Sequence, residues 1–258
     1  MHVFFRYDQD TREEYEIAKQ YLPTSRFTST IPEGSLVLGR YSVLPFYQWV
    51  EEDIVESRKS RLVNTFSEHE YIANASNWAE DLREVTPAVW KCGWANAPDT
   101  EHGWVVKGET NSRKFRWDTH MYAPDRDSLR KVMNRLHEDS LISRQGLIVR
   151  PYIPLKTLEF GINNLPITNE WRCFFLGEKL LSHGYYWSIA ENPVDSCEGL
   201  SVAMDAAKII SRKTNFFVLD IAETETGEWI VIEVNDGQMS GLSNNNPHAL
   251  YSALADIG

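Results

Sequence analysis

Two apolar runs near the C-terminal end of the chain carry acidic residues within them. Residues 216–222 and 229–237 are rich in β-branched and aromatic side chains, and the polar connector between them contains Thr226-Gly227. Strand-like runs joined by such a connector predict a β-hairpin with a tight turn. If the turn is centred on Thr226-Gly227, Asp220 lies directly opposite Glu233.

The same hairpin gathers a third oxygen-bearing side chain. Asn235 follows Glu233 by two positions and therefore shares its face of the strand. Like charges directly opposite each other on a sheet are unfavourable unless a cation or a proton offsets the repulsion. Oxygen ligands of this kind suit Mg²⁺, which is usually held by one or two carboxylates together with nucleotide phosphates. We expect Asp220, Glu233 and Asn235 to bind Mg²⁺; a register slip of one residue would instead turn one acid to solvent.

The first hundred residues alternate between strand and helix patterns, which predicts an α/β region. The expected strands cover 3–7 and 35–38, with a short extended stretch at 62–66, and the expected helices cover 11–21, 45–61 and 68–82. An irregular stretch over 87–103 contains Trp90, Trp94 and Pro98. We place a domain boundary near Glu101, which divides the chain into residues 1–100 and 101–258.

The second region begins with a strand, a polar loop and another strand. The strands are expected at 103–107 and 114–117, with the loop at 108–113. The patterns that follow predict a helix, a strand, a hairpin and a further helix before the acidic hairpin. Their expected ranges are 125–141, 147–153, 170–175 paired with 179–187, and 199–214.

Composition and charge narrow the class of protein. The chain has 258 residues, 42% of them hydrophobic, so it can bury a substantial core. Its 37 acidic residues outnumber 26 basic ones, and a net charge of −11 disfavours general binding to nucleic acids or anionic membranes. Three cysteines without CxxC spacing indicate neither a disulfide framework nor a zinc site. No signal peptide or membrane-spanning stretch is evident, so we expect a soluble, cytoplasmic protein.

Three basic residues in predicted strands could answer the acids. Lys107 and Lys114 flank the 108–113 loop and could present ammonium groups to an anion. The alternative is that both are ordinary exposed lysines at strand ends. Arg172 lies in an apolar strand where an unpaired guanidinium would be costly, so it needs a carboxylate or a phosphate. Glu170, two positions earlier on the same face, could be that carboxylate.

Several common catalytic motifs are absent from the sequence. There is no GxxxxGK[ST] or GxGxxG, which weighs against a P-loop or a Rossmann nucleotide site, and no GxSxG or HExxH. His120 and His183 each stand alone and are interpreted as structural.

Taken in chain order, the candidate residues resemble the ATP-grasp superfamily. Its pattern is a strand lysine, a phosphate-covering loop with a second lysine, an adenine hinge strand, an acid for the ribose, an arginine strand and a terminal metal set. The residues that match are Lys107 and Lys114, the hinge residues Arg150, Tyr152 and Ile153, then Glu159, Arg172 and the set Asp220, Glu233 and Asn235. The resemblance covers about residues 103–242 and is greatest to the clade named for one arginine and two lysines. A eukaryotic cell-division-cycle protein that assembles translation initiation factor two looks like a relative.

The resemblance implies an α+β fold in which two α+β subdomains clasp ATP, preceded by the N-terminal α/β region. It implies ATP and Mg²⁺ as cofactors and catalytic roles for Lys114 and Arg172. It also implies a ligase that activates a carboxylate of a small molecule or peptide as an acylphosphate, which an amine then attacks. Asp236, Ser240 and residues 244–246 could contact this substrate. Two alternatives stay open: an ATP-binding assembly factor that engages a protein partner, and an RNA-end ligase, which the acidic balance disfavours.

Overall fold

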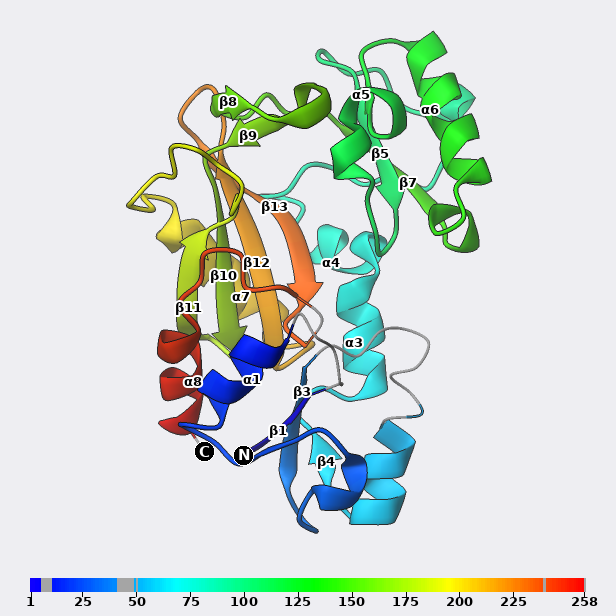
Figure 1. The fold of residues 1–258 in the computed structure, drawn as a ribbon. Coiled ribbons are helices and arrows are strands. Elements are labelled where there is room, and N and C mark those ends of the chain that lie inside the picture. The colour runs from blue at the N-terminus through cyan, green and yellow to red at the C-terminus, as the bar shows by residue number, and fades with distance from the viewer. Residues whose placement is uncertain (6–10, 41–48, 50, 239, 258) are drawn as a thin grey trace.

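The computed structural model describes residues 1–5, 11–40, 49, 51–238 and 240–257 (Figure 1). Its N-terminal part is a parallel sheet with the strand order β2–β1–β3–β4. The strands are β1 (His2–Phe5), β2 (Thr24–Ser25), β3 (Leu36–Arg40) and β4 (Arg61–Leu62); helix α1 (Arg12–Ala18) and the 3₁₀ turn η1 (Thr28–Thr30) lie between them. Strands and helices alternate here as the sequence predicts. Residues 6–7 of the first predicted strand lie outside the described residues.

Two predicted helices before the domain boundary differ from the structure. Residues 45–48 and 50 of the helix predicted over 45–61 lie outside the described residues, and the later part contains a π-helical turn, η2 (Asp53–Ser57). The single helix predicted over 68–82 is wrong, because the chain forms α3 (Phe66–Ala73) and α4 (Ala75–Asp81). The break falls at Asn74, whose extended backbone (φ −95°, ψ 109°) leaves the helix while its side chain donates to the Glu70 carbonyl.

A small antiparallel sheet with the order β6–β5–β7 follows. Strand β5 (Trp104–Gly108) is central, β6 (Tyr122–Ala123) and β7 (Leu147–Pro151) flank it, and helix α6 (Arg126–Glu138) packs on the sheet through Leu129, Val132, Met133 and Leu136. The 3₁₀ turns η3 (Trp94–Asn96) and η5 (Ile142–Arg144) border this lobe. Asp125, the first residue of the predicted helix, is its N-cap and accepts a hydrogen bond from the Ser128 amide at 2.8 Å.

The strand predicted over 114–117 is wrong. The chain forms the 3₁₀ turn η4 (Lys114–Arg116) and then the short helix α5 (Trp117–His120). Both edges of β5 are already paired, with β6 and β7, so no edge of that strand is left for this segment. Phe115, which the alternating pattern placed toward the core, is 56% exposed, whereas Trp117 stacks on Tyr122.

The large antiparallel sheet has the strand order β11–β10–β12–β13. Its strands are β10 (Glu170–Leu176), β11 (Lys179–Tyr185), β12 (Phe216–Glu223) and β13 (Trp229–Asp236). The predicted register is confirmed, because Asp220 pairs with Glu233, and a β-bulge directly follows Asp220. A two-stranded sheet, β8 (Thr157–Phe160) with β9 (Pro166–Thr168), and the turn η6 (Ile162–Asn164) precede the large sheet in the chain.

Both faces of the large sheet are covered (Figure 1). On one face, Trp171, Cys173 and Phe175 share a core with α4 and with helix α7 (Leu200–Ile210). On the other, Phe174, Phe216 and Val218 share a core with helix α8 (Pro247–Ala255), α1 and the N-terminal sheet. Side chains alternate along a strand, so Glu170, Arg172 and Asp220 point to the second face, beyond the end of its apolar core. The boundary near Glu101 stays a prediction. None of the helices in the described ranges is long and apolar enough to cross a membrane.

Candidate functional site

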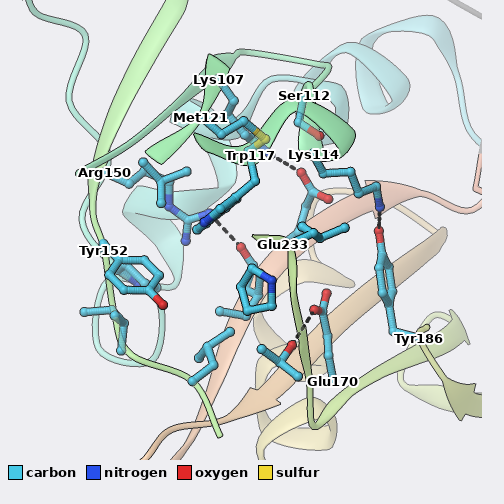
Figure 2. A pocket seen from close by; sticks show the side chains of 18 of the residues that line it. Lys107, Ser112, Lys114, Trp117, Met121, Arg150, Tyr152, Glu170, Tyr186 and Glu233 are labelled. Atoms are coloured by element: carbon cyan, nitrogen blue, oxygen red, sulfur yellow. Dashed lines mark hydrogen bonds and ion pairs between the residues drawn. The ribbon is translucent and has the colours of Figure 1, made fainter. Parts of the chain in front are cut away.

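Two adjoining cavities lie between the small sheet and the large sheet (Figure 2). The first has a volume of about 150 Å³ and mostly apolar walls that include Pro87, Trp117, Met121 and Leu165. The second has a volume of about 390 Å³ and polar walls that include Asn111, Arg172, Asn235 and Asp236. Ser112, Lys114, Tyr186 and Glu233 line both cavities and mark their junction.

Asp220 forms a bidentate ion pair with Arg172. The two residues are register partners on β12 and β10; Nε donates to Oδ1 at 2.8 Å and Nη2 to Oδ2 at 2.7 Å. Asp220 is 0% exposed. Burial lowers the pKa of the Arg172 guanidinium, but the Asp220 charge outweighs it and the pKa is raised, so Arg172 stays charged. The anion that Arg172 needs is thus Asp220, and the pairing with Glu170 considered from the sequence is wrong.

Glu233 is paired with Lys107 across the two lobes. The Lys107 ammonium donates to Glu233 Oε1, and Lys107 is only 6% exposed, so its interpretation as an exposed strand-end lysine is wrong. Burial pulls the pKa of Glu233 upward, but Lys107 and Lys114 outweigh this effect and hold it at about 2. Glu233 is therefore an anion at neutral pH.

Asn235 completes the predicted metal set, because its Nδ2 donates to Asp220 Oδ2 at 3.3 Å. Two carboxylates and an amide oxygen thus meet at one end of the hairpin, a donor set that fits Mg²⁺. Within the described residues, no group of three or more His, Cys, Asp or Glu side chains is arranged to hold a metal ion. Both carboxylates of the predicted set are instead neutralised by cations of the protein.

Lys114 reaches the junction of the cavities from η4 rather than from a strand. Its ammonium donates to the Tyr186 hydroxyl, and Figure 2 shows both side chains extended toward each other. Tyr186 was not expected from the sequence. It follows β11, and its amide donates to the Glu170 carbonyl at 2.8 Å, so the confirmed pairing of β10 with β11 was the signal that could have located it.

The hinge residues predicted for adenine line the apolar cavity. Arg150, Tyr152 and Ile153 all contribute to its wall. The Arg150 guanidinium donates to the Ile232 carbonyl at 2.7 Å and to Thr86 Oγ1 at 3.3 Å. Burial lowers the pKa of Arg150 to about 10, so it remains a cation at neutral pH.

The predicted ribose acid, Glu159, does not line either cavity. It lies on β8, where its Oε1 accepts a hydrogen bond from the Glu191 amide at 2.8 Å. The acid in the wall of the apolar cavity that sequence reasoning missed as a ligand is Glu170, which accepts from Thr168 Oγ1 at 3.2 Å. Burial, aided by the charge of Asp220, raises its pKa to about 8.

Only part of the predicted substrate surface faces the polar cavity. Asp236 and Ser240 line it, whereas residues 244–246 do not. Asn245 bonds to Ser182 and to the Arg172 carbonyl, and Asn246 caps α8, so these two asparagines are structural. His69 also lines the polar cavity and contacts Asp236 through Nδ1; no pattern in the sequence indicated it.

The two lobes and the cavities between them define the class of protein as ATP-grasp. A family model described as an ATP-grasp domain, family 3 of the clade named for one arginine and two lysines, matches residues 44–254, and the chain belongs to this family. The fold and family expected from the sequence are therefore confirmed. No curated protein matches the chain.

Solved structures of similar fold cover nearly the whole chain. A RimK domain ATP-grasp protein from Sphaerobacter thermophilus has a TM-score of 0.62 at 15% identity, with 100% of both chains covered. D-cycloserine synthetase DcsG has a TM-score of 0.64 at 13% identity, covering 99% of this chain and 98% of its own. The ligase PsnB, complexed with a phosphomimetic variant of its minimal precursor, Mg and ADP, has a TM-score of 0.61 at 12% identity, with 99% and 97% covered. At these identities the likeness is one of fold.

Proposed function

We propose that this protein is an ATP- and Mg²⁺-dependent ligase that joins a carboxylate to an amine through an acylphosphate. One observation carries the proposal: each acid suited to the metal is paired with a cation suited to phosphate. Lys107 pairs with Glu233, and Arg172 pairs with Asp220. On binding a magnesium-nucleotide, the acids would exchange these cations for the metal and the cations would exchange the acids for phosphate oxygens. Every buried charge stays compensated in this exchange, which avoids the cost of an unpaired buried ion.

The two cavities suit the two ends of a nucleotide. The apolar cavity, walled by the hinge residues Tyr152 and Ile153 and by Trp117, suits a base, since ligand pockets are mostly apolar with a few placed polar groups. The polar cavity suits phosphates and the acceptor substrate. Lys114 lies where the cavities join, as a cation for the terminal phosphates must.

The chemistry follows from electrostatics and positioning. When bound, Mg²⁺ supplies neutralisation of charge on the β- and γ-phosphates. Lys107, Lys114 and Arg172 would stabilise the charge that develops on the transferring phosphoryl group. The substrate carboxylate attacks the γ-phosphorus and ADP leaves; the amine then attacks the acyl carbon, phosphate leaves and the nitrogen loses a proton. The 108–113 loop would limit the entry of water into this site.

The proposal is tested by thermal unfolding with and without Mg-ATP, followed by a screen for ADP release. A ligand at a hundred times its Kd adds about 2.7 kcal/mol to the folded state, which is readily measured. We expect a shift that needs Mg²⁺, and ADP release only when a carboxylate and an amine are both present. The screen should include short peptides, because PsnB and the macrocyclase MdnC, both of similar fold, are complexed with precursor peptides. No shift at millimolar Mg-ATP would contradict the proposal.

A further inference from the structure

The ring of Tyr186 lies between two of the cations of the site. Lys114 Nζ is 4.4 Å from the ring centroid, and the guanidinium carbon of Arg172 is 4.8 Å from it. The Tyr186 hydroxyl also accepts a hydrogen bond from Lys114. One aromatic side chain therefore contacts both cations at the junction of the two cavities.

Lys114 differs from the other two cations in how it is held. Lys107 has Glu233 and Arg172 has Asp220, but Lys114 makes no ion pair with any residue that the structure describes. Its contacts are the hydroxyl and ring of Tyr186 and the ring of Trp187, 5.5 Å away. Aromatic rings attract cations through their negative faces, most strongly where water is partly excluded. The position of Lys114 in the nucleotide-free protein thus depends on Tyr186.

The neighbouring tyrosine has a different role, because successive side chains of a strand point to opposite faces. Tyr185 is buried in the core with Trp171, and its hydroxyl donates to the Thr168 carbonyl at 2.9 Å. Tyr186 instead lines both cavities. Its contacts with the two cations are therefore contacts within the site and not a consequence of core packing.

We propose that Tyr186 is a positioning residue that gathers Lys114 and Arg172 at the junction of the cavities and so preorganises the site for the terminal phosphates of the nucleotide. Two cations brought together before the phosphates arrive repel each other, and the shared ring offsets part of this repulsion. The hydroxyl orients Lys114, and the ring keeps both cations close to the place where phosphate charge must be bound. This inference rests on the proposed function, because it assumes a nucleotide with more than one phosphate.

The test compares Tyr186→Leu, Tyr186→Phe and the control Tyr185→Phe, using calorimetric affinities for Mg-ATP and for AMP. Without the ring, Tyr186→Leu should weaken Mg-ATP on the order of tenfold and leave AMP unchanged, since AMP lacks the terminal phosphates. Tyr186→Phe keeps the ring and should stay within about threefold of the wild type. Tyr185→Phe should change neither affinity. Equal loss of AMP and Mg-ATP binding, or wild-type Mg-ATP affinity in Tyr186→Leu, would overturn the proposal.

A second measurement needs no nucleotide. Brief acetylation with acetic anhydride, read by mass spectrometry, should modify Lys114 several-fold faster in both Tyr186 variants than in the wild type, with Lys131 on the surface of α6 as the internal reference. Unchanged Lys114 labelling would show that Tyr186 does not hold it and would overturn the proposal. If the wild type failed to bind Mg-ATP, the proposed ligase function would fall, while the labelling would still decide whether Tyr186 positions Lys114.

Discussion

The acids of the site and the second lysine are held in different ways. Asp220 and Glu233 project from neighbouring strands of the large sheet, so the backbone register fixes the spacing between them. Lys114 projects from a 3₁₀ turn after a loop. That turn is tied down by side chains, through the Arg113–Asp139 ion pair at 2.8 and 2.5 Å and through the contact with Tyr186. One half of the site is therefore built into the sheet, and the other half is attached to the lobe above it.

This difference separates stability from binding. A charge buried in a sheet needs its partner in order to fold, so removing it disturbs both the fold and the site. A partly exposed lysine on a turn contributes little to folding, and its effect should be confined to the ligand. The first two predictions test this separation on each half in turn.

The largest effect is expected for Asp220→Asn. The change leaves the buried Arg172 without an opposite charge, and breaking a buried ion pair costs about 3–5 kcal/mol of the free energy of unfolding. Because Asp220 is also a proposed metal ligand, the thermal shift produced by Mg-ATP should disappear. Chemical denaturation and thermal unfolding with the nucleotide measure the two consequences.

Glu223→Gln is the matched control for this variant. Glu223 lies three residues further along β12 and pairs with Lys156, which is half exposed. Exposed pairs contribute about 0–1 kcal/mol, so this variant should unfold nearly as the wild type does and should keep its response to Mg-ATP. Equal destabilisation of the two variants would mean that the Asp220–Arg172 pair has no special weight in the sheet.

The second effect is expected for Lys114→Met and concerns binding alone. Without an ion pair to lose, the free energy of unfolding should change by less than about 0.5 kcal/mol, as for most surface substitutions. The Mg-ATP affinity should fall about 10- to 100-fold, because a hydrogen bond to a charged group is worth about 1.5–3 kcal/mol. Lys131→Met, on α6 of the same lobe, should leave that affinity unchanged. A destabilised Lys114→Met with normal affinity would reverse the comparison.

The same contrast explains how much the sequence could predict. The Asp220–Glu233 register followed from alternation and a tight turn, because both are local properties of a hairpin. The 3₁₀ turn at Lys114 was missed, because whether an alternating run becomes a strand depends on a free sheet edge elsewhere in the fold. Tyr186 and His69 were missed for a related reason, since each reaches the site from an element distant in sequence from its partner.

A third prediction concerns pH and the buried acid of the apolar cavity. With its pKa raised to about 8, Glu170 is neutral at pH 7 and becomes an anion as the pH rises through 8. A new negative charge near the phosphates should weaken Mg-ATP binding about three- to tenfold by pH 9, if charges some 10 Å apart interact at an effective dielectric of about 20. Glu170→Gln should match the wild type at pH 7 and lack the decline attributable to this group. Parallel affinity curves for the two proteins between pH 7 and 9 would show that Glu170 does not titrate in this range.

The smallest effect is expected for Glu159→Gln, which tests the role implied for this residue by the family resemblance. Glu159 accepts a hydrogen bond from the Glu191 amide and does not line either cavity, so a neutral isostere that keeps the acceptor should change the Mg-ATP affinity less than about twofold. The preference for ATP over 2′-deoxy-ATP, measured by the same titration, should also stay unchanged, whereas Glu170→Gln should alter it if the acid in the cavity wall contacts the ribose. Loss of that preference in Glu159→Gln alone would mean that nucleotide binding draws β8 toward the cavity and that the ribose acid is Glu159, as the family pattern implies.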